Sequence, residues 1–586
     1  MSMLGWLRRL VGAESRNCGA ELGSVTGPGA VSSTPNDSIA LGAQALREGR
    51  FADAIAELEA ALEQHPDGAI HRLLARAREA AGDQEGALDE LQLALHLQPD
   101  DPETQVDLAE RLLFAGRREE ALELCDRGIG SARDAQLHLR LARCLKMLDR
   151  LPQAIAQYEL VLQSRPRDAG ILSSLGLAQA ASGAFAAAEA SYARALDGDP
   201  DCVEALHNLA LLRREQGAVD AARDLFGRAL ALRPESIDTQ SALAHALRDL
   251  GRTEEALALY RRVLARRPQP VDALLNFSYA LLMSGQLAEG WDAYERRLTF
   301  PDPPVSAPPP AQRWSGEAAV AVHVVGEQGL GDQIMFASCL PDLLRRATHV
   351  SLTCAPNLER LFRRSFRGVE LRSRDSGAPQ AARWAALGSL PSYFRRRVGD
   401  FPVTGRYLQA DPDAVARWRQ RLDGLGPGPR IGLSWRGGTL RTRGHLRSIP
   451  VAAFAPLASA SPATWFSLQY GQVDEDATRL GKMLGLHHWP EIGGDLDECA
   501  ALIEALDLVV TIDTTAAHLA GALGQRVWIL LSQAPEWRYG LSGAALPWYP
   551  SARLFRQPAA GDWRTVIDAV KRALVAECRK KEKAPR

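Results

Sequence analysis

Two segments of the chain combine residue types that could bind a ligand, and in one of them the ligand would be a phosphate group. In one of them, an apolar run of Leu and Val leads into Asp513, Thr514 and Thr515, and then into a small-residue helix that contains His518. The free N–H groups and the positive dipole end of such a helix attract anions, and the threonine hydroxyls add donors. His518 follows Thr514 by one helical turn and is therefore expected to face the same ligand. The alternative is a well-capped core helix with an incidental histidine.

The other segment is the glycine-rich loop that runs from Gly326 to Gln333, with the sequence GEQGLGDQ. Its glycines, which include Gly329 and Gly331, would let backbone amides approach a ligand closely. Asp332 stands at the predicted start of a helix. Because the glycines do not have the G-x-G-x-x-G spacing, a dinucleotide site is not predicted. The alternative is that Asp332 caps the helix and the glycines shape a tight turn.

Each of these segments follows an apolar run that is typical of a buried strand. Strands and helices alternate twice in the second half of the chain, which predicts two α/β units with parallel sheets and a cleft between two lobes. Ligands of such sheets bind at the carboxyl ends of the strands. Ser434, Trp435 and Arg436 end the first strand of the second unit and are expected to line the cleft, where Trp435 either stacks on a base or packs in the core. The predicted strands lie within 319–325, 350–354, 430–438, 464–470, 506–512 and 526–531.

The first half of the chain has a different period of 34 residues. Prolines recur with gaps of 33, 67, 34, 34 and 34 residues, so one repeat near Arg133 has lost its proline. Self-similarity at this period predicts a solenoid of helical hairpins, and such solenoids bind other chains. About eight units are expected over 35–304. The prolines are Pro66, Pro99, Pro166, Pro200, Pro234 and Pro268.

One unit, which starts at Val203, shows how each hairpin is built. Gly217 permits a sharp turn, the face formed by Ala222, Phe226 and Ala229 packs against the first helix, and Pro234 stops the second helix. Small alanines let the helices approach, while the aromatic ring fills the gap between hairpins. This pattern resembles the tetratricopeptide repeat.

The total charge of −2 hides a difference between the two halves. Lys and Arg number 30 against 43 Asp and Glu over 35–304, whereas they number 36 against 26 over 305–586. One interpretation is that solenoids are often acidic on their solvated faces, so the difference has no functional meaning. The other is that the second half binds an anion such as a nucleotide sugar. Nucleic acid is not expected, because the arginines are dispersed among acidic residues and no nucleic-acid-binding motif is present.

Neither metal nor membrane chemistry is indicated. The eight cysteines form no CxxC pair, and no run of 18 apolar residues is present. The opening residues read as a short amphipathic helix without a cleavage site. We therefore expect a cytoplasmic protein with no transmembrane segment, no metal and no cofactor.

The two lobes together resemble a known family of enzymes. A strand–GLGD–helix opening lobe followed by the pattern DTTAAHLAGALG is similar to the heptosyltransferase-like GT-B glycosyltransferases, and the block Leu546–Pro550 resembles bacterial proteins that fuse tetratricopeptide repeats to such a transferase. The expected fold is an α-solenoid followed by a two-lobed, Rossmann-like GT-B region. The expected domains are a flexible segment over 1–34, the solenoid over 35–304, a Pro-rich linker over 305–316, lobes over 317–428 and 429–577, and a charged tail over 578–586.

The resemblance implies roles for particular residues. Asp332 would be the general base for the acceptor hydroxyl, and the donor's phosphates would be held by Asp513, Thr514, Thr515 and His518, with Thr515 standing where the family has glycine. A lysine of the family has no lysine counterpart in this sequence, and Arg447 is the nearest cation. Its guanidinium could bind a diphosphate or a sugar carboxylate through two hydrogen bonds. The donor-binding set is Gly329, Gly331, Ser434, Arg436, Arg447, Asp513, Thr514, Thr515 and His518.

The implied function is transfer of a sugar from a nucleotide-sugar co-substrate to Ser or Thr of a protein docked on the solenoid. The mechanism would be direct displacement at the anomeric carbon without a metal. Flagellin is the leading acceptor by resemblance. The alternatives are a transferase that acts on lipopolysaccharide or another glycan, and a non-catalytic scaffold with a degenerate transferase region. The solenoid and the lobes are expected to fold independently on either side of the Pro-rich 301–312.

Overall fold

The computed structural model describes residues 35–266, 271–299, 312–373, 383–403, 405–426, 428–438, 444–459, 463–471 and 473–583. The chain divides into two compact units, one ending at Leu212 and the other beginning at Arg213. The expected N-terminal segment over 1–34 and most of the expected linker over 305–316 lie outside the described residues.

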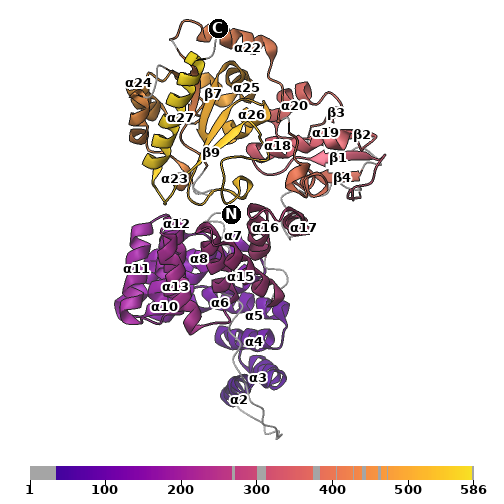
Figure 1. The fold of residues 1–586 in the computed structure, drawn as a ribbon. Coiled ribbons are helices and arrows are strands. Elements are labelled where there is room, and N and C mark those ends of the chain that lie inside the picture. Colours follow the sequence, from indigo (N-terminus) through magenta and orange to yellow (C-terminus); the bar gives the residue numbers. More distant parts are fainter. Residues whose placement is uncertain are drawn as a thin grey trace. The chain divides into compact units, whose positions relative to one another are not determined.

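The described part of 35–299 forms eight consecutive helical hairpins, as the period predicts (Figure 1). The first helix of each hairpin has 13 residues, and the second has 14 in every hairpin but the last, where an 8-residue helix leads into a 3₁₀ turn. The first unit holds α2(Pro35–Arg47), α3(Phe51–Gln64), α4(Gly68–Ala80), α5(Gln84–Leu97), α6(Pro102–Phe114), α7(Arg118–Ser131), α8(Ala135–Met147), α9(Leu151–Ser164), α10(Ala169–Ala181), α11(Phe185–Gly198) and most of α12(Val203–Glu215). The second unit continues with α13(Val219–Leu232), α14(Ile237–Asp249), α15(Thr253–Arg266), α16(Val271–Met283), α17(Leu287–Tyr294) and η2(Glu295–Thr299).

The turn inside each hairpin needs a left-handed backbone. Gly217 has φ +85° and Gly251 has φ +75°, and the equivalent turns also hold glycine with positive φ, except that Asp149 takes the position with φ +65°. Glycine adopts this conformation without a steric penalty, and Asp tolerates it better than most residues. Glycine therefore recurs at this position of the repeat because the turn requires a left-handed backbone.

We predict that Gly251→Ala destabilises the second unit by about 1 kcal/mol, because Ala adopts a left-handed φ only at a cost. A Cβ at Gly251 would meet nothing within 4 Å, so the loss would arise from the backbone alone. The matched control is Gly227→Ala in the exposed middle of α13, where a Cβ also meets nothing and Ala should stabilise the helix. Urea unfolding followed by tryptophan fluorescence measures both, and equal shifts of the same sign would contradict the prediction.

The first lobe of the α/β region contains a four-stranded parallel sheet among its described residues. The strand order is β3-β2-β1-β4, so β1 is flanked by β2 on one side and β4 on the other. The strands are β1(Ala321–Val325), β2(His349–Thr353), β3(Val369–Leu371) and β4(Arg383–Ala386). Two helices of this lobe matter below: α18(Leu330–Phe336), which follows the glycine-rich loop, and α20(Glu359–Ser365).

In the described part of the second lobe, five strands form a parallel sheet with the order β6-β5-β7-β8-β9. The strands are β5(Arg430–Ser434), β6(Thr464–Ser467), β7(Leu508–Ile512), β8(Val527–Leu531) and β9(Ala552–Arg556). Both faces of the sheet are covered, since alternate strand residues pack against α24(Asp474–Leu484) and α27(Trp563–Lys583) on one side and against α25(Leu496–Ala505) and α26(Thr515–Ala522) on the other. The chain order reverses between β5 and β7, which makes their carboxyl ends the topological switch point where doubly wound sheets bind ligands.

The last hairpin of the solenoid packs into the same hydrophobic core as both lobes. Trp291 of α17 is fully buried, its ring lies 5.5 Å from that of Trp537, and its Nε1 donates to the Arg395 carbonyl at 2.9 Å. The structure therefore departs from the expectation that solenoid and lobes fold independently on either side of 301–312. The reason is that α17 has no further repeat to cover its aromatic face, and the lobes cover it instead.

Candidate functional site

The predicted site residues at the ends of β5 and β7 lie next to one another. Thr514 is the N-cap of α26 and has extended backbone angles, and Thr515 is the first helical residue. Gly437 follows β5, and a Cβ there would meet the Thr514 methyl at 2.9 Å and the Asp513 carbonyl at 3.1 Å. The start of α26 thus faces the end of β5 at the topological switch point of the sheet.

The two lobes meet where α18 crosses α26. A Cβ at Gly331 would lie 2.7 Å from the His518 ring, so this glycine lets the two helices approach each other. The His518 Nδ1 lies 2.9 Å from the Tyr549 hydroxyl. Burial, and next the charges of Arg538 and Arg447, lower the pKa of His518 well below its usual value. His518 is therefore a neutral residue of the lobe interface in this structure, packed between Gly331 and Tyr549.

A chain of opposite charges connects the two predicted segments across the lobes. The Arg538 guanidinium donates to Asp332 Oδ1 at 2.5 Å and lies 3.7 Å from Asp513 Oδ1. Arg447, on the short helix α23(Gly444–Arg447), donates to Asp513 Oδ2 at 3.0 Å. Glu536 lies 3.6 Å from Arg447. Arg538 thus links the carboxylate of the first lobe to Asp513 of the second lobe, and Arg447 contacts the other carboxylate oxygen of Asp513.

The protonation of this cluster follows from its burial. Burial raises the pKa of Asp332 above its usual range, and the negative charges of Glu536 and Asp513 add to this effect, while Arg538 opposes it. Burial and the charge of Asp513 raise the pKa of Tyr539 well above its usual value, so its hydroxyl remains a donor to Asp513 Oδ1 at 2.6 Å. Asp332 is accordingly a carboxylate with the strengthened basicity that suits a general base.

The structure also shows how Asp332 sits in its helix. Gly329 is the N-cap of α18, and Asp332 is its third residue, whose Oδ2 accepts a hydrogen bond from the Gly329 N–H at 3.3 Å. The alternative that Asp332 itself caps the helix is therefore wrong by position. Its carboxylate still supports the first turn of α18 by accepting from the Gly329 N–H, so Asp332 has a structural role in this helix.

Ser434, Trp435 and Arg436 form a separate network at the end of β5. Gln469 Oε1 accepts from the Ser434 hydroxyl at 3.1 Å and from the Arg436 N–H at 2.8 Å. Trp435 is fully buried and its Nε1 donates to Asp476 at 3.1 Å, which favours the packing role over base stacking. The Arg436 side chain is half exposed and pairs with Asp476 at 2.7 Å. These residues shape the strand end, and Arg436 alone of the three reaches solvent.

Sequence reasoning missed Glu536, Arg538 and Tyr539, which come from the turn around η11(Trp537–Tyr539). This turn belongs to neither of the two motifs. The signal that would have found it is positional, because the turn follows β8 and ligands gather at the carboxyl ends of neighbouring parallel strands. Among the described residues, no cluster of His, Cys, Asp and Glu could hold a metal ion, and no helix is long and apolar enough to span a membrane.

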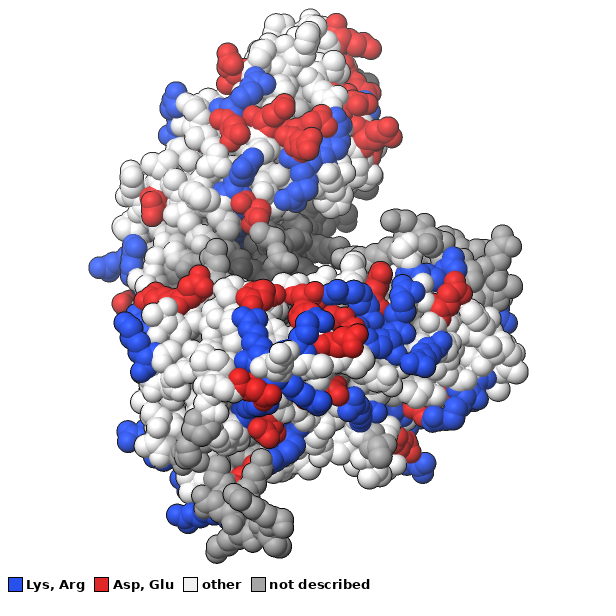
Figure 2. Space-filling view, turned by 90° about the horizontal axis from the view of Figure 1, so that it is seen from above, with Lys and Arg blue, Asp and Glu red and all other residues white. Residues whose placement is uncertain are grey.

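Charged side chains elsewhere on the second unit pair locally. On the face drawn in Figure 2, Lys and Arg lie among Asp and Glu, in agreement with the dispersion seen in the sequence. Arg364 of α20 donates to Asp497 of α25 at 2.8 Å. Arg417, on α22(Pro412–Leu422), pairs with Glu498 at 2.9 Å. Some of the arginines that give residues 305–586 their positive charge therefore form ion pairs between helices.

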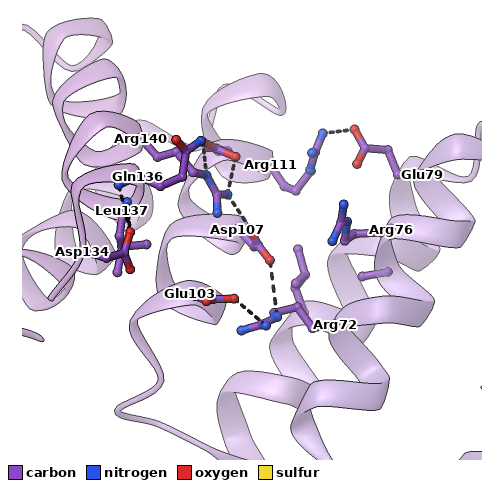
Figure 3. A pocket seen from close by; sticks show the side chains of 13 residues that line it. Arg72, Arg76, Glu79, Glu103, Asp107, Arg111, Asp134, Gln136, Leu137 and Arg140 are labelled. Atoms are coloured by element: carbon purple, nitrogen blue, oxygen red, sulfur yellow. Dashed lines mark hydrogen bonds and ion pairs between the residues drawn. The ribbon is translucent and has the colours of Figure 1, made fainter. Parts of the chain in front are cut away.

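A second candidate site is a polar pocket of about 550 Å³ on the first unit (Figure 3). Most of its lining comes from the first helices of three consecutive hairpins, α4, α6 and α8, and Leu91 of α5 also contributes. Arg140 pairs with Glu110 and Asp107, Arg72 pairs with Glu103, and Arg111 pairs with Glu79. Arg76 is exposed and has no ion pair among the described residues. Among the described residues that line this polar pocket, Arg76 is therefore the arginine available to pair with a ligand.

Comparison with known proteins identifies the hairpins. Models of the tetratricopeptide repeat match residues 39–102, 106–169, 174–237 and 213–275. The solenoid is built from tetratricopeptide repeats. This confirms the prediction made from the 34-residue period, and these repeats are followed by an α/β region with parallel sheets.

Protein FlbA and several solved structures are similar to parts of this chain. Protein FlbA of Caulobacter vibrioides is 32% identical over 289 residues, which cover 45% of this chain and about half (48%) of FlbA. The tetratricopeptide protein YrrB, described as having an unusual peptide-binding site, is 16% identical, covers 31% of this chain and 95% of its own, and has a TM-score of 0.28. MamA from Desulfovibrio magneticus RS-1 is 19% identical, and the match covers 29% of this chain and 96% of MamA with a TM-score of 0.27. The type IV pilus biogenesis factor PilW is 19% identical, and the match covers 35% of this chain and 96% of PilW with a TM-score of 0.32.

Proposed function

We propose that the α/β region is a GT-B-type glycosyltransferase that uses a nucleotide sugar and acts on a protein segment held by the tetratricopeptide repeats. The single observation that carries this proposal is the link, across the lobe interface, from Asp332 through Arg538 to Asp513, the residue that precedes the N-cap of α26 and also binds Arg447. A basic carboxylate beside a phosphate-type anion site is the pairing that glycosyl transfer needs.

The proposed reaction assigns a task to each group. The acceptor hydroxyl oxygen attacks the anomeric carbon and loses its proton to Asp332, while the bond from that carbon to the donor's phosphate oxygen breaks. The departing diphosphate is stabilised by Arg447 and by the N–H groups at the start of α26. Arg538 lies between the base and the phosphate site, where it holds Asp332 in its charged form before the proton is taken.

We propose that the acceptor docks in the pocket lined by α4, α6 and α8. Tetratricopeptide solenoids bind other chains, and docking raises the local concentration of an acceptor near a transferase. Arg76 would pair with an acidic residue of that acceptor. Flagellin remains the named acceptor that the family resemblance suggests.

A second candidate function is a non-catalytic scaffold. It is favoured by the way Arg447 and Arg538 are already neutralised by Asp513, Glu536 and Asp332, and by the close packing of α18 on α26. Such a protein would bind its partner through the repeats and would bind no nucleotide. A transferase acting on lipopolysaccharide or another glycan would bind nucleotide and leave proteins unmodified.

Two measurements on the full chain separate these functions. Isothermal titration calorimetry with UDP, GDP, CDP, ADP and dTDP tests the phosphate site, and intact mass spectrometry of flagellin from cells with and without the gene tests the acceptor. Nucleotide binding together with a sugar-sized mass difference supports the proposal. Absence of binding by all five nucleotides would favour the scaffold, and binding without a mass change would favour a glycan acceptor.

We predict that Arg447→Ala weakens binding of the recognised nucleoside diphosphate about 10- to 100-fold, because a hydrogen bond to a charged phosphate from a mostly buried guanidinium is lost. Calorimetry measures the change in Kd. The control is Arg479→Ala, which removes an exposed arginine of the same lobe that pairs with Glu475. Unchanged affinity in Arg447→Ala would place the phosphate site elsewhere.

A further inference from the structure

The last repeat reaches into the glycine-rich loop that precedes Asp332. Arg297 of η2 is buried and donates through Nε to Glu327 Oε2 at 3.2 Å, and a second guanidinium nitrogen donates to Glu327 Oε1. Glu327 Oε1 also accepts from the Gly388 N–H at 3.0 Å, at the end of β4. A residue of the solenoid thus neutralises a buried carboxylate at the end of β1.

The next residue of the loop, Gln328, has a strained backbone. Its φ is +64°, a left-handed conformation that residues with a side chain rarely adopt. Two contacts hold it there. The Gln328 side-chain amide donates to the Tyr294 hydroxyl, and the Gln328 carbonyl accepts from the Gln333 side chain at 3.4 Å. Asp332 follows Gln328 by four residues, so the direction in which α18 starts depends on this conformation.

Tyr294 is itself held firmly in place by its neighbours. The Arg297 guanidinium lies 4.1 Å from the centre of the Tyr294 ring, and Trp291 packs edge-on against that ring at 5.7 Å. Tyr294 therefore presents its hydroxyl from a fixed position. The hydroxyl that restrains the loop belongs to α17, not to either lobe.

We propose that Tyr294 is a positioning residue for Asp332, acting through Gln328, so that the last tetratricopeptide hairpin completes the active site of the α/β region. The catalytic consequence of this inference rests on the proposed function, because Tyr294 would control the placement of Asp332, the proposed base. The restraint on the loop itself is a property of the fold and can be measured without activity.

The test compares Tyr294→Phe in two backgrounds of the full-length protein. In the natural background, loss of the hydroxyl leaves the strained Gln328 unheld, and a misplaced base lowers kcat by about tenfold while KM for the donor changes little. In the Gln328→Gly background, glycine adopts φ +64° without strain and the hydroxyl has no partner. Tyr294→Phe should then change kcat less than about twofold.

Hydrogen–deuterium exchange provides the readout that does not need activity. Tyr294→Phe should increase exchange in peptides that cover Gly326–Phe336 and leave β7 unchanged. The control is Tyr279→Phe, which removes a hydroxyl from the same aromatic cluster while its ring keeps stacking on Trp537 at 6.2 Å. That variant should alter neither kcat nor exchange in the loop.

The outcomes separate the two proposals. An equal loss of kcat in both backgrounds would show that Tyr294 acts through packing alone and would overturn the inference, as would unchanged exchange of the loop. If the natural protein transfers no sugar but Tyr294→Phe still loosens Gly326–Phe336, the proposed function fails while the restraint by Tyr294 stands.

Discussion

Asp332→Asn is expected to lower the turnover number for sugar transfer by about 100-fold or more, because asparagine cannot take the proton of the acceptor hydroxyl. The substitution keeps an oxygen that can accept from the Gly329 N–H, so α18 should still start at the same residue. Arg538 loses its partner at 2.5 Å but keeps Asp513 at 3.7 Å. Steady-state kinetics and a melting curve on the same preparation measure the two effects.

The pH dependence of the same reaction gives an independent check. Transfer requires the deprotonated form of Asp332, so the rate should fall as pH decreases through the pKa of Asp332. Because burial raises that pKa, the acidic limb should lie above the ordinary aspartate value of about 4. The limb should be absent in the residual activity of Asp332→Asn. Normal turnover combined with early melting would show instead that Asp332 is structural.

The largest effect on stability is expected for Arg297→Ala, which should destabilise the second unit by about 3–5 kcal/mol. The substitution leaves Glu327 buried without its counter-ion at the end of β1. Urea unfolding followed by tryptophan fluorescence is a suitable measurement, since of the 12 tryptophans only Trp6 precedes residue 213.

The control for this prediction neutralises both partners. In Arg297→Met with Glu327→Gln, the glutamine can still accept from the Gly388 N–H, and no unpaired charge remains. This double variant should be more stable than Arg297→Ala. A loss below about 1 kcal/mol in Arg297→Ala would mean that water or another group reaches Glu327.

Much of the solenoid could be predicted because its determinants are local. Glycine at a left-handed turn and proline after a helix act within a few residues, and the 34-residue period repeats them. Gly217 and Gly251 occupy the turns that the pattern requires. What the period could not predict is that α16 and α17 share a core with the lobes, because their aromatic residues read as ordinary repeat positions.

The strands were predictable where they are apolar and central. Six apolar runs correspond to β1, β2, β5, β6, β7 and β8, whereas β3, β4 and β9 were missed. The missed strands lie at sheet edges, are short, or carry charged residues such as Arg383 and Arg553, so the hydrophobic signal is weak.

For the candidate site, the sequence indicated both glycine and threonine segments and Arg447. The structure brings Arg447 to Asp513, and it adds Arg538, which links Asp513 to Asp332. That link depends on contacts between residues about 200 positions apart, and no local pattern encodes such contacts. For His518 the helical position predicted that it faces the ligand of Thr514, whereas the structure packs its ring between Gly331 of the first lobe and Tyr549.

The shared core of the last hairpin has a consequence for synthesis of the protein. Trp291 leaves the ribosome long before its partners Trp537 and Trp548, and at usual elongation rates the delay for these roughly 250 residues is about 10–50 s. The first unit can fold during this time, and the first lobe can supply Phe336 and Arg395, but the part of the α17 aromatic face that Trp537 and Trp548 cover stays exposed. The nascent chain therefore carries an apolar surface on this hairpin until residues 537–548 have been synthesised, which makes the hairpin the expected place for chaperone binding.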